Sequence, residues 1–120
     1  MHKLESLDVW KVSHSTAVLC YRVTLTPPLK HHFAAADQIR RAAVSIPANI
    51  AEGYGLYTRP QLIRHLRIAL ASAYELRTHL EIMSDVGLLT TEDSNRTTEL
   101  VNRTIRLLIG TLRGLERKRD

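Results

Sequence analysis

Apolar residues recur along this chain at the spacing of amphipathic helices, in four long segments that proline, glycine and hydroxyl residues separate. The third segment is the most regular, because its apolar residues alternate steps of four and three without a gap. These residues are Leu62, Leu66, Ala69, Ala73, Leu76, Leu80 and Met83. Thr58 and Gln61 form a capping box with Pro60 in the first turn, and Gly87 follows as a left-handed C-terminal cap. The pattern predicts a helix over residues 59–86.

The second segment has a similar seam interrupted by a proline. Its apolar residues, in steps of four, three and four, are Ile39, Ala43, Ile46 and Ile50. This spacing predicts a helix over residues 34–54 that packs against other helices. Pro47 falls in its middle, so we expect a kink there; the alternative is a split helix with Ser45 as the new N-cap. Gly53 and Gly55 then end the segment.

The first and fourth segments complete the architecture. The first spans residues 8–26 and stops at Pro27-Pro28, which cannot continue a helix. We assign to its inner face the apolar residues Leu7, Trp10, Ala17 and Tyr21. The fourth spans residues 91–117 after a hydroxyl-to-acid start signal at Thr90, and its seam consists of Val101, Ile105, Leu108, Leu112 and Leu115. Four helices with short connections predict an all-α fold: an antiparallel up-down four-helix bundle forming one domain over residues 1–120.

Composition excludes several classes of protein. The single cysteine, Cys20, excludes an internal disulfide framework and a cysteine-rich zinc site, and we expect it to be a buried small side chain. No apolar run approaches the ~18–20 residues that a membrane span needs, and the opening residues lack the apolar core of a signal peptide. No P-loop, dinucleotide fingerprint or metal-ligand spacing is present. We therefore expect a cytoplasmic protein without membrane attachment, cofactor, metal or catalytic residues, and not an enzyme.

The charge of the chain is concentrated on the fourth predicted helix. The formal net charge is +5, and 13 of the 17 Lys and Arg residues are Arg. Within one arc of roughly 100°, opposite the apolar seam, lie Arg96, Arg103, Arg106, Arg113 and Arg117, with Gly110 among them. Arginine can grip phosphate oxygens with its planar fork. We interpret this arc as a nucleic-acid backbone surface; the alternatives are a solvated face or arginines that pair with acids of a neighbouring subunit.

A second basic cluster opens the third predicted helix. It contains Arg59, Arg64 and Arg67 with His65, has no acid nearby in sequence, and opposes the helix dipole. We interpret it as a phosphate or partner site, against a plain surface. Aromatic residues are scarce near these arginines, and Phe33 is the only phenylalanine. Binding should therefore depend on backbone and shape, with little sequence specificity.

Two further sets of residues indicate internal or subunit contacts. A polar stripe beside the seam of the second predicted helix contains Gln38, Arg41, Ser45, Asn49 and Glu52. No histidine is near it in sequence, so we interpret the stripe as a hydrogen-bonded network that fixes helix register or a subunit contact, rather than as an active site. The outward face of the third helix carries Ile68, Ala71, Glu75 and Ile82. Apolar residues there predict self-association.

The second predicted helix also carries a resemblance to a known family. Residues 38–55 read QIRRAAVSIPANIAEGYG, which closely resembles the signature of the four helix bundle protein family, also called the 23S ribosomal RNA intervening-sequence protein family. Shorter matches are LDVWK at 7–11, LRIALAS at 66–72 and DVGLLT at 85–90, while residues 56–60 depart from the family pattern. The resemblance implies a four-helix bundle, assembly as a ring of five, and a distant relation to the accessory proteins of diversity-generating retroelements.

Two hypotheses for function follow. The first is a non-enzymatic oligomeric bundle that binds RNA or DNA non-specifically through arginine-rich outer surfaces. The alternative is a structural or adaptor module, whose arginines serve contacts with other subunits or with a partner protein. A ring of five copies would carry about +25, enough to make a modest charge per chain a strong field.

Overall fold

The computed structural model describes residues 3–56 and 58–117, and helices account for most of them. The four long helices are α1 (Asp8–Thr24), α2 (Phe33–Gly55), α3 (Arg59–Asp85) and α4 (Thr91–Arg117). Two short 3-10 turns precede α1 and α2: η1 (Leu4–Ser6) and η2 (Leu29–His31). No strand occurs within the described residues. The predicted all-α fold is confirmed, and the helix bounds agree to within two residues.

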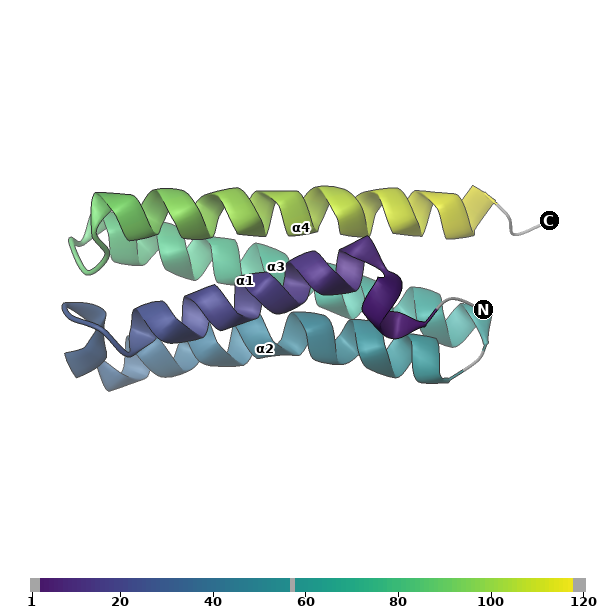
Figure 1. Ribbon diagram of the computed structural model, residues 1–120, viewed down its shortest axis with the longest axis horizontal. Coiled ribbons are helices and arrows are strands. Elements are labelled where there is room, and N and C mark those ends of the chain that lie inside the picture. Colours follow the sequence, from purple (N-terminus) through teal and green to yellow (C-terminus); the bar gives the residue numbers. More distant parts are fainter. Residues whose placement is uncertain (1–2, 57, 118–120) are drawn as a thin grey trace.

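The helices lie side by side and antiparallel in an elongated bundle of 49 × 22 × 20 Å (Figure 1). Each helix packs against its neighbours in sequence, and α1 packs against α4 to complete the bundle. The start of α3 therefore lies at the same end as the C-terminus of α4 (Figure 1). This arrangement confirms the four-helix bundle and brings the C-terminal part of the α4 arginine arc to the same end as the basic cluster of α3.

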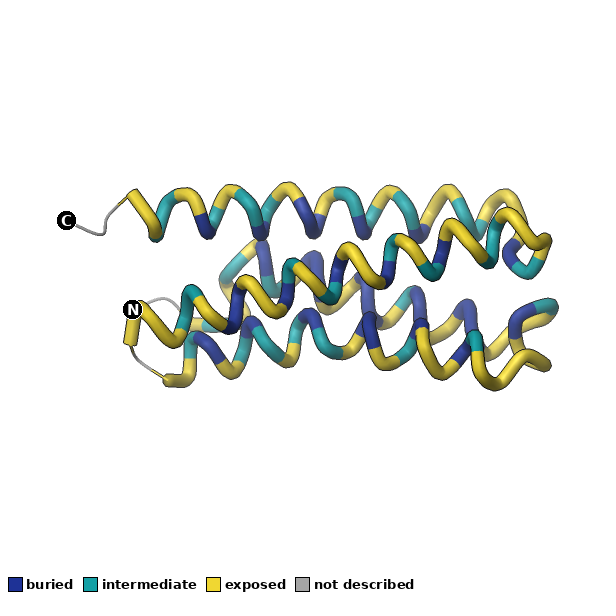
Figure 2. The backbone as a smooth tube through the Cα atoms, turned by 180° about the vertical axis from the view of Figure 1, so that it is seen from behind, coloured by how far each residue is buried: buried dark blue, intermediate teal, exposed yellow. Residues whose placement is uncertain are grey.

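The core forms along the predicted seams of α2, α3 and α4. Figure 2 shows the buried positions on the inner side of each helix. All four seam residues of α2 are buried, while Leu62, Met83 and Leu115, at the ends of their seams, are half-buried and pack against the core. Burying such side chains stabilises each by about 1.5–3 kcal/mol. The heptad-like spacing thus identified the inner faces of three helices correctly.

The inner face predicted for α1 is correct at Leu7, Trp10 and Ala17 and wrong at Tyr21. Tyr21 is 43% exposed, and the residues that reach the core include Val9, Val12, Cys20 and Val23. The physical reason is that α1 also buries hydroxyl residues, which an apolar pattern does not count. Thr16 donates to the carbonyl of Val12 at 2.7 Å and meets the Thr104 hydroxyl of α4 at 3.0 Å. A hydroxyl satisfied in this way is tolerated in a core.

The predicted helix ends are confirmed. The Thr58 hydroxyl accepts from the amide of Gln61 at 3.4 Å, and the Thr90 hydroxyl accepts from the amide of Asp93 at 3.1 Å. Gly87 has φ of 81°, in the left-handed region that glycine enters without strain.

Helix α2 continues through Pro47. The alternative of a split helix with Ser45 as N-cap is therefore wrong, and the expected kink stays a prediction. The helix ends at Gly55, as predicted, whereas Gly53 lies inside it. Gly53 packs against α3, and an added Cβ there would lie 2.9 Å from the Cβ of His65.

Cys20 is fully buried in the core, as predicted, and this burial raises the pKa of its thiol from 9.0 to about 12. In the unfolded chain the thiol ionises near pH 9, whereas in the fold it keeps its proton. The contribution of this group to stability is complete below pH 9 and is lost between pH 9 and 12. We expect the free energy of unfolding to fall by up to about 1.4 kcal/mol per pH unit over that range. Urea unfolding from pH 8 upward should show this extra slope in the native chain and not in Cys20→Ala.

Candidate functional site

The first basic surface, which we call the α4 arginine face, consists of Arg96, Arg103, Arg106, Arg113 and Arg117. All five are exposed, and the buried seam lies on the other side of the helix. Arg96 approaches the Asp93 carboxylate at 3.7 Å, whereas the other four have no carboxylate partner in the described part of the chain. Gly110 adds no obstruction, because nothing lies within 4 Å of where its Cβ would be. The face therefore presents guanidinium groups directly to solvent.

The second basic cluster lines a groove of about 870 Å³ at the start of α3. Its walls include Arg59, Arg64 and Arg67, together with Ile68. No acid is near this cluster in sequence, but the fold brings one to it: Nη2 of Arg67 is 2.6 Å from Oε2 of Glu116, which comes from α4. Both side chains are largely exposed, so water screens the pair and its contribution to stability is small. His65 does not belong to this cluster, because its side chain is buried.

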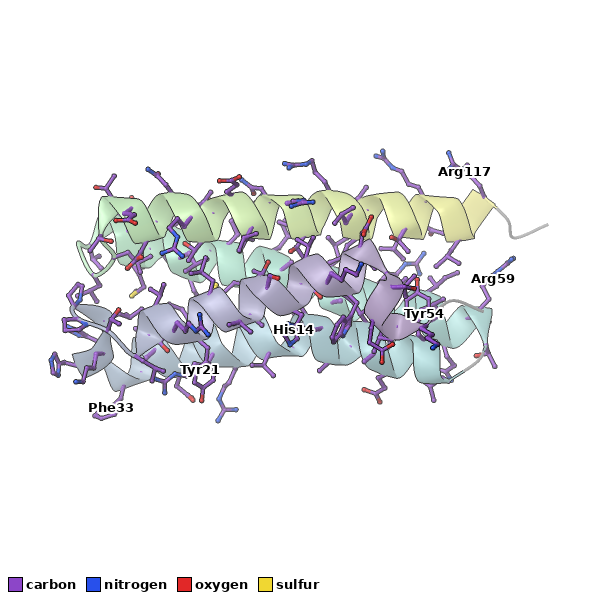
Figure 3. The ribbon with its side chains drawn as sticks, in the orientation of Figure 1. His14, Tyr21, Phe33, Tyr54, Arg59 and Arg117 are labelled. Atoms are coloured by element: carbon purple, nitrogen blue, oxygen red, sulfur yellow. The ribbon has the colours of Figure 1, made fainter. Side chains whose placement is uncertain are left out.

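The two basic surfaces share one end of the bundle. The labelled side chains of Arg59 and Arg117 both lie at the end where α3 begins and α4 finishes (Figure 3). The ion pair between Arg67 and Glu116 bridges the same two helices. Arg59, Arg64 and Arg67 line the groove together with Glu116, and Arg113 and Arg117 lie within one turn of Glu116 along α4. We call this region the basic end.

The predicted polar stripe of α2 joins α3 through a half-buried network. The hydroxyls of Ser45 and Ser72 are 2.9 Å apart, and Nδ2 of Asn49 donates to the Ser45 carbonyl at 2.9 Å. Oδ1 of Asn49 lies 3.1 Å from Nδ1 of His65. Because an amide oxygen only accepts, we assign the proton to Nδ1. Oε2 of Glu52 lies 3.9 Å from the same nitrogen.

Sequence reasoning placed His65 in the basic cluster and missed its contact with the polar stripe, because its partners are on another helix. Its position one residue before the seam residue Leu66 was the only signal. Its presence corrects the expectation that no histidine is near the stripe, although it contacts Asn49 and not the Ser45 hydroxyl. Gln38 is exposed, and Arg41 pairs with Asp37 at 2.8 Å on the surface. This network holds α2 and α3 in register and provides no base for Ser45.

Removing the centre of this network is expected to destabilise the fold. Asn49→Ala leaves Nδ1 of His65 without its acceptor, so the free energy of unfolding should fall by about 1–3 kcal/mol. Gln38→Ala is the matched control, because it truncates an exposed amide on the same helix and should change stability by less than ~0.5 kcal/mol. Urea denaturation measures both. Equal losses in the two variants would contradict the role of the network.

The outward face of α3 is exposed, as predicted. Ile68 is 37% exposed and Ile82 is 48% exposed, with Ala71 and Glu75 between them on the same surface. Oε2 of Glu75 lies 3.2 Å from Nε2 of His79. The use of this face in self-association stays a prediction.

Within residues 3–56 and 58–117, no three His, Cys, Asp or Glu side chains are close enough together to hold a metal ion. None of the helices in that part of the chain is long and apolar enough to cross a membrane.

Fold and charge together define the class of this protein as a basic four-helix bundle with exposed arginine surfaces. The sequence model of the 23S rRNA-intervening sequence protein family matches residues 5–110. The chain therefore belongs to the 23S rRNA-intervening sequence protein family.

Comparison with solved structures gives a similar bundle. It is a protein with unknown function from the S23 ribosomal protein family of Bacteroides thetaiotaomicron VPI-5482, with 28% sequence identity and a TM-score of 0.79. The match covers 87% of this chain and 97% of that chain. The comparison with curated proteins finds no match.

Proposed function

We propose that this protein is a non-enzymatic, oligomeric bundle that binds RNA or DNA mainly through the phosphate backbone. The observation that carries this proposal is the α4 arginine face, where Arg103, Arg106, Arg113 and Arg117 are exposed without a carboxylate partner among the described residues. A guanidinium stays charged at every relevant pH and bonds two phosphate oxygens at once. The basic end extends this surface onto α3.

Oligomerisation would multiply the surface. Exposed apolar residues on α3 support self-association, and the family resemblance supports a ring of five. Copies arranged in a ring would present several α4 arginine faces to one strand. Binding at several faces at once raises the overall affinity although the contacts made by each face stay the same.

A structural or adaptor role is the second candidate. It is supported by the groove at the start of α3, in which apolar walls such as Ile68 and Ala71 lie beside arginines. Such a mixed surface suits an acidic, amphipathic protein partner. In this case the arginines would serve protein contacts, and affinity for nucleic acid would be weak.

A salt series distinguishes the two candidates. Fluorescence anisotropy with mixed-sequence RNA and duplex DNA should give binding whose log affinity falls linearly with log salt. Light scattering on the same sample gives the mass of the particle. Absence of binding to either probe at low salt would overturn the nucleic-acid proposal, and a monomeric mass would overturn the oligomer.

A further inference from the structure

Two aromatic side chains stand exposed where α1 and α2 meet at their connecting turn. Phe33 is 82% exposed, and Tyr21, expected in the core, is 43% exposed. Figure 3 shows both toward the same end of the bundle, on the side of α1 and α2 and away from the basic end. Exposed aromatic residues without a packing role in the bundle indicate a contact with something else.

Arginine accompanies the Tyr21 ring. The guanidinium carbon of Arg40 lies 5.0 Å from the ring centroid, within the range of a cation–π contact. Nε of Arg40 also donates to the Thr24 hydroxyl at 2.8 Å, which fixes the guanidinium in place. The ring and the guanidinium are therefore already ordered before any ligand arrives.

A shallow apolar hollow of about 430 Å³ lies beside this pair, between α1 and α2. Tyr21 and His14 are two turns apart on its α1 wall, and Val44 and Pro47 contribute from α2. His14 packs in turn on Trp10, with ring centroids 4.9 Å apart. The rings of Trp10, His14 and Tyr21 thus follow one another along α1, and the apolar hollow lies between His14 and Tyr21.

The charge around these rings is positive. Residues 9–36 contain no Asp or Glu, while Lys11, Arg22 and Lys30 fall within them. Asp37 is neutralised by its pair with Arg41 at 2.8 Å. A phosphate backbone could therefore approach without meeting an unpaired carboxylate from this stretch.

We propose that this surface binds unpaired bases of single-stranded nucleic acid by stacking. We call it the stacking platform and define it by His14, Tyr21, Arg22, Phe33 and Arg40. Flat aromatic rings and guanidinium planes are the groups on which proteins stack splayed bases, and neighbouring cations hold the strand. The inference rests on the proposed function and adds to it a preference for single strands that carry bases over strands that lack them.

The dimensions of the platform suit a short stretch of strand. Phe33 and Arg40 are seven residues apart on α2, which corresponds to roughly 10 Å along the helix axis. At about 3.4 Å per stacked nucleotide, this spacing accommodates about three nucleotides.

A second tyrosine provides a contrast within the same molecule. Tyr74 is also exposed and has the guanidinium of Arg77 5.0 Å from its ring centroid. Glu75 follows it directly, and Glu81 lies two turns further along the same helix. Glu75 pairs with His79, as Asp37 does with Arg41, but Glu81 has no ion-pair partner among the described residues and would repel a phosphate backbone. The proposal therefore concerns Tyr21 and not Tyr74.

The test compares strands with and without bases. Anisotropy of an oligo(U) strand and an abasic strand of equal length is measured with the full chain, with Tyr21→Ala/Phe33→Ala, and with Tyr74→Ala as the matched control. We expect the native chain to prefer oligo(U). The double variant should bind oligo(U) about 10- to 100-fold more weakly and the abasic strand unchanged. Tyr74→Ala should change neither affinity, and Tyr21→Phe should retain the preference.

Three other outcomes overturn the inference. Equal affinity of the native chain for the two strands shows backbone binding alone, which leaves the proposed function intact. A double variant that keeps its preference for oligo(U) places any stacking elsewhere. A double variant with a lower particle mass by light scattering shows that the face is a contact between copies. A native chain that binds neither strand is a different result, because it overturns the proposed function itself.

Discussion

Changing Arg106 and Arg113 to Glu should weaken binding to mixed-sequence RNA and to duplex DNA by about 10- to 100-fold at low salt. Both side chains are exposed on the α4 arginine face, and neither has a carboxylate partner in the described residues. Their reversal removes two phosphate contacts and adds two repulsive charges without disturbing the core. The slope of log affinity against log salt should become shallower by about two, because each phosphate contact contributes about 0.9. Anisotropy titrations over a range of salt concentrations measure both quantities.

A matched control separates the location of the charge from its total. Lys3→Glu/Lys11→Glu makes the same change in net charge at two exposed positions outside α4. If the α4 arginine face is the binding surface, this control should retain most of the affinity for duplex DNA, which offers no unpaired bases to the stacking platform near Lys11. Equal losses in the two double variants would show that only the total charge matters. A fall in particle mass with the arginine variant would assign those arginines to subunit contacts instead.

Sequence periodicity predicted the architecture well, because the information it needs is local. A seam such as that of α3 repeats within one helix, and a cap such as Thr58 acts within one turn. The same local character explains the error in α1. Thr16 is buried there because Thr104 of α4 provides a partner, and that partner is 88 residues away in sequence.

The candidate sites show the same difference between features within one helix and contacts between two helices. Exposure of the α4 arginines followed from helix geometry, since the five lie opposite one apolar seam. By contrast, the contact of Arg67 with Glu116 and that of His65 with Asn49 each join two helices. Neither pair has a sequence signal, because their spacing is set by how the helices pack.

Tyr21 shows how one misassigned residue affects a functional interpretation. Counting it among core residues removed an aromatic ring from the surface, and the remaining surface offered arginines without stacking partners. Its exposure, with Arg40 over the ring, is the observation that adds base stacking to the proposed strand contact. Backbone contacts alone are insensitive to bases, whereas a stacked ring requires them.

The close packing of α2 on α3 makes the fold sensitive to a substitution at Gly53. A Cβ at Gly53 would lie 2.9 Å from Cβ of His65 and 3.2 Å from Cδ1 of Leu62. Since the Cβ of His65 is fixed to the backbone, the two helices must separate to accept Gly53→Ala. Overpacking of this kind lowers the free energy of unfolding by about 1–3 kcal/mol. The separation also strains the hydrogen bond between His65 and Asn49. We expect the melting temperature to fall by roughly 5–15 °C.

Gly110→Ala is the matched control, because it makes the same change inside α4, where nothing lies within 4 Å of the added Cβ. In a helix interior alanine is favoured over glycine by about 0.5–1 kcal/mol, so this variant should be slightly more stable than the native chain. The melting temperature and the midpoint of urea unfolding should therefore fall for Gly53→Ala and rise for Gly110→Ala. A stabilised Gly53→Ala would show that α2 and α3 do not approach as closely as 2.9 Å between these atoms. In that case the network of Asn49 and His65 would not depend on a glycine at this contact.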